Sequence, residues 1–181
     1  MADHTGLPPL HLQLAGPAAR PSGHPGHAFV FEHLAVGEYP TPEDAPWLRE
    51  TAAVTAVISL QDESDLDRKG LSLPSLERAY AAHGIAFHRL PVADGDAAAL
   101  RERLDEAVAL LAALLARGER VYLHCNAGLN RAPTIAIAYL HVHRAQSLDA
   151  ACAFVKERRA CVPYMRMLAA HYGDGGSATD L

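Results

Sequence analysis

Two patterns of hydrophobic and polar residues alternate along the chain. Short runs rich in Val, Ile, Leu and aromatic residues predict strands at 28–31, 34–36, 54–60, 85–90 and 120–124. Longer stretches with apolar residues at helical spacing predict helices at about 43–52, 72–83, 97–117, 131–145, 147–159 and 163–172. Strands that alternate with helices predict an α/β fold: a three-layer sandwich with a central, largely parallel five-stranded sheet flanked by helices.

The patterns also divide the chain into segments. Residues 1–27 are rich in Pro and Gly and lack periodicity, which predicts a flexible arm, and the tail at 173–181 is expected to be disordered. Between them, residues 28–172 are long enough for one domain with a full core. The composition, 50% hydrophobic and 20% charged over 181 residues, is ordinary for a soluble globular protein.

Charge and cysteine content narrow the possible functions. The net charge of −5 argues against a basic nucleic-acid-binding face, and the longest apolar run, Ala107–Ala116, is too short to span a bilayer. Three cysteines show neither an even disulfide framework nor metal-binding spacing, which favours a reducing compartment. We therefore expect a cytoplasmic monomer that holds no metal ion or cofactor and has no nucleic-acid or membrane partner.

One segment carries residues typical of a catalytic site: His124-Cys-Asn-Ala-Gly-Leu-Asn-Arg131. It links the strand at 120–124 to the helix at 131–145, so the loop ends at a helix N-terminus, where free N–H groups and the helix dipole favour a phosphate. Facing these groups, Cys125 should be a thiolate that takes the phosphoryl group as nucleophile. Arg131 offers a planar fork for two phosphate oxygens. The residues between them are expected to bind the substrate phosphate: Asn126, Ala127, Gly128, Leu129 and Asn130.

The motif His-Cys-x-x-Gly-x-x-Arg resembles the signature of the dual-specificity branch of the cysteine-dependent protein tyrosine phosphatases. The segments Leu34–Gly37 and Val54–Leu60 are similar to the opening strands of that family. Within the family, three segments most resemble the plant starch (glucan) phosphatases and laforin: Ala127–Pro133, Leu60–Leu66 and Arg158–Pro163. The resemblance covers roughly residues 28–172 and implies a dual-specificity phosphatase-like fold.

The resemblance also implies a general acid, an aspartate roughly thirty residues before the cysteine. Asp94 (125 − 94 = 31) and Asp96 (125 − 96 = 29) are both candidates. Asp96 directly precedes the helix at 97–117, where a carboxylate can cap free N–H groups. Asp94 has no such alternative role and aligns with the acid of the family, so we favour Asp94.

The sequence gives less information about the substrate class than about the reaction. The main interpretation is a dual-specificity phosphatase acting on phosphorylated Tyr, Ser or Thr in proteins, and the alternative is a phosphatase of phosphorylated glucan. A non-catalytic phosphate-binding module is disfavoured because Cys125, Arg131 and an acid are all present. Where the resemblance implies sugar-binding aromatic residues, this chain has Arg68, Lys69 and Gly95. Arg68 and Lys69 favour an anionic substrate, unless they only form a solvated turn.

Overall fold

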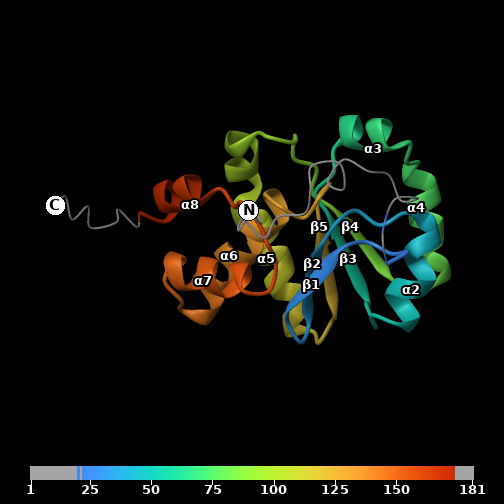
Figure 1. The fold of residues 1–181 in the computed structure, drawn as a ribbon, viewed down its shortest axis with the longest axis horizontal. Helices are drawn as coiled ribbons and strands as arrows, with labels where there is room; N and C mark the ends of the chain where they lie inside the picture. Colours follow the sequence, from blue (N-terminus) through green and yellow to red (C-terminus); the bar gives the residue numbers. More distant parts are fainter. Residues whose placement is uncertain (1–19, 21, 174–181) are drawn as a thin grey trace, which may run out of the picture.

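The computed structural model describes Arg20 and residues 22–173, and these form a sheet between two layers of helices (Figure 1). The strands are β1 (His27–Phe31), β2 (Leu34–Gly37), β3 (Ala56–Ser59), β4 (Ala86–Arg89) and β5 (Val121–His124). The helices are the short 3-10 helix η2 (Pro42–Asp44), then α2 (Ala45–Glu50), α3 (Glu63–Lys69), α4 (Leu73–Ala82), α5 (Ala97–Ala116), α6 (Arg131–Arg144), α7 (Leu148–Lys156) and α8 (Met165–Tyr172).

The five strands follow the order β1-β2-β5-β3-β4. Strand β1 pairs antiparallel with β2, and the other neighbours are parallel. This arrangement confirms the predicted α/β sandwich with a largely parallel sheet. Because β5 is central, the loop that follows it emerges between the carboxyl ends of β2 and β3, where open α/β sheets bind their ligands.

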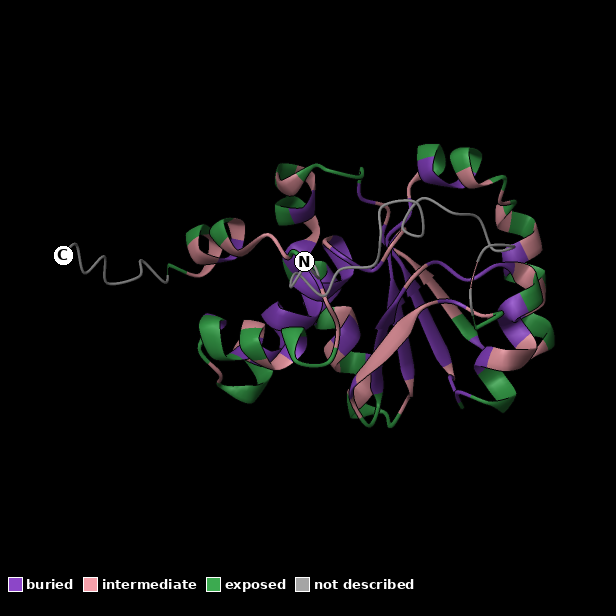
Figure 2. Cartoon of the chain, in the orientation of Figure 1, coloured by how far each residue is buried: buried purple, intermediate pink, exposed green. Residues whose placement is uncertain are grey.

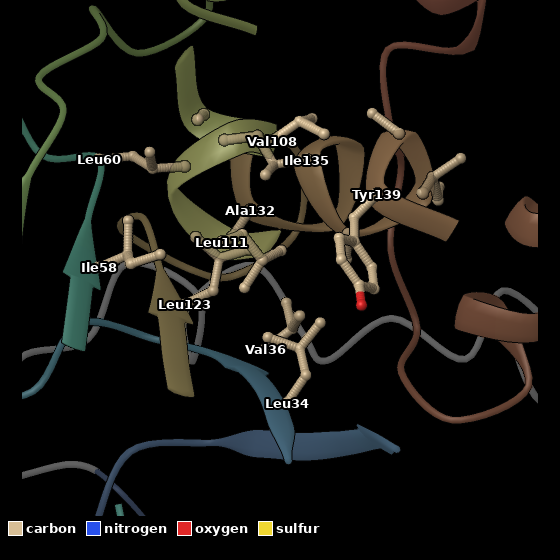
Figure 3. Packing of buried hydrophobic residues seen from close by; sticks show 14 of the residues in the cluster. Leu34, Val36, Ile58, Leu60, Val108, Leu111, Leu123, Ala132, Ile135 and Tyr139 are labelled. Atoms are coloured by element: carbon tan, nitrogen blue, oxygen red, sulfur yellow. The ribbon is translucent and has the colours of Figure 1, made fainter. Parts of the chain in front are cut away.

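Both faces of the sheet are buried, so alternate residues of each inner strand enter different halves of the core. In β5, Val121 and Leu123 pack on one face and Tyr122 on the other. The first half of the core is covered by α5 and α6 and contains Leu34, Ile58, Leu111 and Ile135 (Figure 3). The second half is covered by α2 and α4, on the opposite side of the sheet (Figures 1 and 2). Burial on both faces explains why the strands are short apolar runs rather than alternating ones.

Most predicted elements are present with ends shifted by one to three residues. The predicted helix at 43–52 is divided into η2 and α2. Helix α3 was not predicted: residues 63–69 had been assigned to the connection before the next helix. Its start is marked by Asp62, whose side chain accepts from Asp65 N, and its end by Gly70 in the left-handed conformation at φ 63°.

The N-terminal boundary also differs from the prediction. The predicted arm, 1–27, includes His27, which opens β1, and Arg20, whose Nη1 lies 2.8 Å from Asp44 Oδ2. The described part of this arm is therefore attached to the domain. The rest of the predicted arm and tail, residues 1–19, 21 and 174–181, lies outside the described residues.

Two further observations concern the described residues. None of the helices there combines the length and the apolar character required to cross a membrane. No group of three or more His, Cys, Asp or Glu side chains is placed to hold a metal ion within Arg20 and 22–173.

Candidate active site

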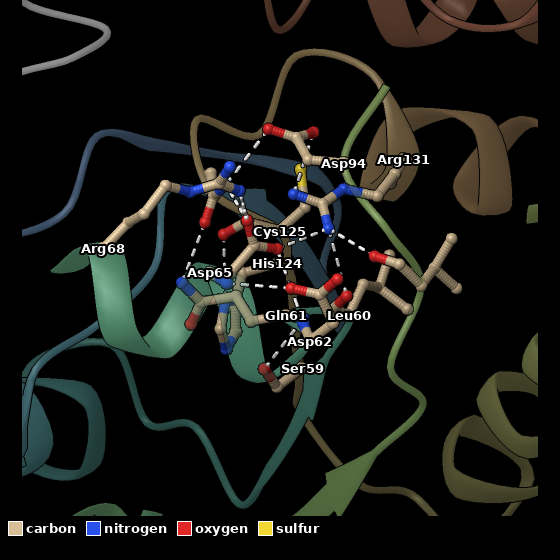
Figure 4. A network of polar contacts seen from close by, with 12 residues as sticks. Ser59, Leu60, Gln61, Asp62, Asp65, Arg68, Asp94, His124, Cys125 and Arg131 are labelled. Carbon is tan, nitrogen blue, oxygen red and sulfur yellow. Dashed lines mark hydrogen bonds and ion pairs between the residues drawn. The ribbon is translucent and has the colours of Figure 1, made fainter. Parts of the chain in front are cut away.

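The carboxyl ends of three parallel strands bring the predicted site residues together. Strand β5 ends at His124, directly before Cys125, and Arg131 begins α6. Leu60 and Gln61 follow β3, and the segment containing Asp94 follows β4. Residues far apart in the sequence therefore meet at one edge of the sheet, around the loop 125–131 (Figure 4).

The carbonyl groups of this loop all point outward to fixed donors. Asn126 O accepts from Tyr39 N at 3.1 Å, and Leu129 O accepts from Val162 N at 2.8 Å. Between them, Arg159 donates from Nη2 to Ala127 O at 2.7 Å and from Nε to Gly128 O at 2.8 Å. Because the C=O and N–H of a trans peptide point in opposite directions, the loop N–H groups face the interior of the loop, as an anion site requires.

Gly128 is required by this geometry. Its φ of 65° lies in the left-handed region, and a Cβ there would be 2.5 Å from Gly37 O and 2.7 Å from Arg159 Nη2. Any larger residue would both strain the backbone and displace β2 or Arg159. The glycine therefore allows the loop to curl tightly against β2.

The nucleophile candidate and the histidine before it are both buried. Cys125 is 3% exposed at the base of the loop, and His124 is 2% exposed. Burial lowers the pKa of His124 to about 4, so the imidazole is neutral at neutral pH. Its Nδ1 lies 3.1 Å from Cys125 O, which can only accept, so Nδ1 carries the proton and donates.

Arg131 is completely buried, with one nitrogen anchored. Its Nη1 donates to Val92 O at 2.6 Å, to Asp65 Oδ2 at 2.7 Å and to Leu60 O at 3.2 Å. Nη2 lies 3.0 Å from Asp94 Oδ1 without the alignment of a hydrogen bond, and Nε has no hydrogen-bond partner among the described residues. The edge formed by Nε and Nη2 thus makes no hydrogen bond within the described residues and can bind two oxygens of a phosphate in place of Asp94.

The charge of Arg131 is balanced by its neighbours. Burial opposes the charged form, but the negative charges of Cys125, Asp65 and Asp94 raise the pKa of Arg131. The arginine therefore stays charged at every working pH, although water does not reach it.

Asp65 lies beneath the arginine and connects it to Asn126. Its Oδ1 accepts from Arg68 Nη2 at 2.6 Å and from Asn126 Nδ2 at 2.7 Å. Burial by itself would raise the pKa of Asp65, but the hydrogen bonds from Arg131, Asn126 and Arg68 outweigh it and lower the pKa. Neither Asp65 nor Arg159 was assigned a role from the sequence, where they entered only within segments that carry the family resemblance.

The two aspartates considered for the acid lie in different surroundings. Asp94 is half-exposed and points at Arg131 Nη2, and its Oδ2 accepts from Asn126 Nδ2 at 3.1 Å. Asp96 caps α5, because its Oδ1 accepts from both Ala98 N and Ala99 N at 2.9 Å. The structure therefore brings Asp94, and not Asp96, to the loop that contains Cys125.

The remaining predicted binding residues are distributed unevenly. The Arg68 side chain is more than half exposed and contacts the site through Asp65. Lys69 lies apart from this network, with Nζ 5.3 Å from the centre of the Tyr39 ring. The Asn130 side chain points out of the loop and donates to Val162 O at 2.7 Å, so it braces the loop from outside.

Comparison with known proteins agrees with this geometry. The chain is 33% identical over 135 residues to phosphoglucan phosphatase LSF1 of Arabidopsis thaliana, an alignment that covers 74% of this chain and 23% of that protein. It is 35% identical over 138 residues to phosphoglucan phosphatase DSP4 of Castanea sativa, covering 75% of this chain and 36% of that protein. The chain thus spans about a quarter to a third of the length of these relatives.

Solved structures share the fold. The crystal structure of Tk-PTP in the active form superimposes with a TM-score of 0.69 at 23% identity, over 81% of this chain and 96% of that one. The family model described as dual specificity phosphatase, catalytic domain, matches residues 36–172. This match includes β3, β4, β5, the second half of β2 and all of the loop that holds Cys125 and Arg131. The chain belongs to the dual-specificity phosphatase family.

Proposed function

We propose that this protein is a phosphoric monoester hydrolase that works through a phosphocysteine intermediate. The observation that carries the proposal is the pairing of Cys125, at the base of a loop whose carbonyls all point outward, with the open edge of a buried Arg131. Loop N–H groups and the guanidinium would bind the three non-bridging oxygens, and both are fixed before the substrate arrives. Such preorganised donors are the main source of stabilisation for charge that develops in a transition state.

The residues supply the two steps of the reaction. In the first, the Cys125 thiolate attacks phosphorus, the bond to the leaving oxygen breaks, and Asp94 donates its proton to that oxygen. In the second, Asp94 takes a proton from water, water oxygen attacks phosphorus, and the S–P bond breaks to release inorganic phosphate and the thiolate. Arg131 holds the transferring group in both steps. Ala132 follows Arg131 without a hydroxyl that could assist the leaving sulfur, so the second step is expected to be the slower one.

The proposed substrate is a phosphorylated protein side chain. Beside the acid, a pocket of about 350 Å³ lies between Ala97 and the segment 163–167, lined by Tyr164, Met165 and Met167 among others. Ala97, which lines this pocket, is three residues after Asp94, and the charge of Asp94 adds to burial in raising the pKa of Tyr164. A largely apolar pocket near Asp94 suits an aromatic or aliphatic side chain better than a hydrated sugar.

A phosphorylated glucan is the second candidate. Two relatives with 33% and 35% identity carry the name phosphoglucan phosphatase, and this similarity is the observation that favours it. Against it, Arg68 and Lys69 occupy positions where the family resemblance implies sugar-binding aromatic residues, and charged side chains do not provide a stacking surface for sugar rings.

The reaction is tested by changing Cys125 to Ser. We expect Cys125→Ser to abolish hydrolysis of p-nitrophenyl phosphate, since the hydroxyl is a far weaker nucleophile at neutral pH. A chelator should leave the unaltered enzyme fully active, and vanadate should inhibit it as an analogue of five-coordinate phosphorus. Activity that survives the substitution, or that is lost to the chelator, would contradict the mechanism.

The substrate class is tested with a panel. Purified protein is assayed with phosphotyrosine and phosphothreonine peptides, phosphoinositides, and phosphorylated amylopectin, and kcat/KM is compared at one salt concentration. We expect the phosphopeptides to be the best substrates. A higher rate on amylopectin than on every peptide would move the glucan candidate to first place.

A further inference from the structure

We propose that Asp65 is a positioning residue that holds Arg131 directly and Asp94 through Asn126, so that one buried carboxylate sets the spacing between the phosphate-binding group and the acid. This inference rests on the proposed phosphatase function. Asp65 comes from α3, the helix that hydrophobic periodicity did not predict, and its side chain is completely buried (Figure 4).

The first part of the argument is the cost of burying Asp65. Taking a carboxylate and a guanidinium out of water carries a large desolvation penalty, so a buried ion pair is poor evidence for a gain in stability. Asp65 nevertheless lies 2.7 Å from Arg131 Nη1, with neither side chain exposed. Because burial of this pair is not accounted for by a gain in stability, the orientation that it imposes on Arg131 is the better explanation.

The orientation follows from which nitrogen is engaged. The three acceptors of Arg131, namely Asp65 Oδ2 and the carbonyls of Leu60 and Val92, all converge on Nη1. The opposite edge of the guanidinium, Nε and Nη2, therefore faces the loop. Without the carboxylate, only two neutral carbonyls would hold Nη1, and the planar group could rotate away from the position where it binds two phosphate oxygens.

The second part of the argument concerns Asn126. Its Oδ1 accepts from Gln61 Nε2 at 2.9 Å, so its Nδ2 faces the two carboxylates. Nδ2 donates to Asp65 Oδ1 at 2.7 Å and to Asp94 Oδ2 at 3.1 Å. One amide group thus ties the acid to the same carboxylate that holds the arginine. The two arms can be separated by experiment, because Asn126 contacts Asp94 without contacting Arg131, whereas Asp65 contacts Arg131 directly.

The direct test compares Asp65→Asn with the unaltered enzyme on two substrates. We expect kcat to fall about 10²-fold on both p-nitrophenyl phosphate and an alkyl phosphate, because the displaced arginine acts on every substrate. Tungstate binding, measured by calorimetry in a Cys125→Ser background, should weaken roughly tenfold to a hundredfold as a charge-assisted contact is lost. The binding measurement needs no turnover, so it tests Asp65 even if the phosphatase proposal fails.

Asn126→Ala tests the second arm. It should lower kcat on the alkyl phosphate, which needs a proton donor, more than kcat on p-nitrophenyl phosphate, since nitrophenolate leaves without help. The matched control is Asp44→Asn, which removes a different buried carboxylate that pairs with Arg20 and accepts from Thr41 N at 2.7 Å. We expect this control to lower the melting temperature without changing tungstate affinity.

Three results would overturn the inference. The first is an Asp65→Asn variant that folds and keeps both kcat and tungstate affinity. The second is an Asp44→Asn variant that weakens tungstate binding as much as Asp65→Asn does. The third is an Asn126→Ala variant that slows both substrates equally. If Asp65→Asn does not fold, Asn126→Ala still decides whether the amide positions the acid. Loss of phosphatase activity in the unaltered protein, with the expected effect of Asp65→Asn on tungstate, would reject the proposed function alone.

Discussion

Two aspartates two positions apart have separate roles because only one of them faces the phosphate site. Asp94 contacts Arg131, and Asp96 caps α5. We expect Asp94→Ala to lower kcat by about 10²–10⁴ on a substrate with a poor leaving group and to remove the fall in rate at alkaline pH, because the proton donor is lost. Asp96→Ala should cost on the order of 1 kcal/mol of stability through the lost helix cap.

The measurement for this pair combines pH–rate profiles on an alkyl phosphate with thermal unfolding of both variants. Asp96→Ala serves as the control for Asp94→Ala, since both remove one carboxylate from the same loop. Equal kinetic damage from the two substitutions would refute the assignment of the acid.

His124 makes the stability of the domain depend on pH. Burial lowers the pKa of His124 to about 4, below the ordinary value near 6.5 that the unfolded chain should show. The unfolded chain therefore binds a proton more readily, and the stabilisation is complete above pH 6.5 and is lost as the pH falls from 6.5 to 4. Between pH 7 and pH 5 the loss should be roughly 2 kcal/mol for this one residue.

Urea unfolding at pH 7 and pH 5 tests this expectation. His124→Asn keeps a donor for Cys125 O but cannot be protonated, so its free energy of unfolding should fall less between the two pH values than that of the unaltered protein. The difference isolates His124 from His27 and His88, whose pKa values are also lowered by burial. An identical pH dependence in both proteins would show that the imidazole is not the group responsible.

Some individual residues of the site could be identified from the sequence, and others could not. Cys125 and Arg131 were found because their spacing and their place between a strand and a helix have a direct chemical meaning. Asp94 required the family resemblance to separate it from Asp96. Asp65 was missed because its importance depends on burial and on contacts with residues more than 60 positions away, which local patterns do not show.

Among the elements, the C-terminal end of α7 controls the shape of the catalytic loop. Arg159 follows that helix and donates to two successive carbonyls of the loop. We expect Arg159→Lys to lower kcat roughly tenfold to a hundredfold with a smaller effect on the melting temperature, because a single ammonium cannot reach both carbonyls with the geometry of the fork. Steady-state kinetics on p-nitrophenyl phosphate checks this expectation.

Arg158 provides the control for Arg159. Its guanidinium lies 3.6 Å from the centre of the Phe154 ring and donates to Phe154 O, so it stays on α7 and does not touch the loop. Arg158→Lys should therefore leave kcat unchanged. Similar kinetic losses in both variants would mean that α7 as a whole, rather than the Arg159 fork, supports the loop.

Helix α3 shows why one element was not predicted while the others were. Helix α5 was evident from an apolar stripe at helical spacing, which contributes buried residues such as Leu104 and Leu111. In α3 only Asp65 and Leu66 are buried, and the remaining residues are exposed or nearly so, mostly charged. Its signals are the capping pattern of Asp62 and Asp65 and the stop at Gly70, and such signals are weak without an apolar face.

For the whole molecule, the distribution of charge affects which substrates are attracted. The chain carries a net charge of −5, yet Arg68 extends from the site into solvent. If Arg68 and Lys69 face the substrate, kcat/KM for acidic phosphopeptides should exceed that for neutral phosphoglucan, and added salt should remove the advantage. Exposed charges are screened over about 8 Å at physiological ionic strength, so the advantage should fall steeply above it.

Replacing both Arg68 and Lys69 with aromatic residues tests this expectation. The pair Arg68→Tyr and Lys69→Phe should lower kcat/KM for acidic phosphopeptides and raise it for phosphorylated amylopectin. Arg78→Gln is the control, since Arg78 is an exposed cation on α4 whose contact is with Ser75 of the same helix. If the double change alters neither substrate, the two cations form only a solvated turn.

At this largest scale the sequence was most informative. The alternation of strands and helices predicted the layered sheet, because each element has to bury an apolar face on a neighbour. The position of β1 and β2 at one edge, by contrast, depends on a pairing between Leu34–Gly37 and Val121–His124, strands that lie far apart in the sequence. Such pairings are set by the assembled core, and no local pattern specifies them.

Before substrate binds, the Asp94 carboxylate lies at the position on Arg131 that a phosphate would take, so it competes with phosphate for the arginine. The carboxylate lies 3.0 Å from the nitrogen that an incoming phosphate would use, and because it is tethered, its effective concentration at the arginine is high. A free inorganic anion has to displace it with few compensating contacts, whereas a phosphorylated substrate brings the binding energy of its remaining groups. After hydrolysis the same carboxylate can return to the arginine as phosphate departs. In the proposed mechanism, Asp94 would thereby also limit inhibition by the phosphate product.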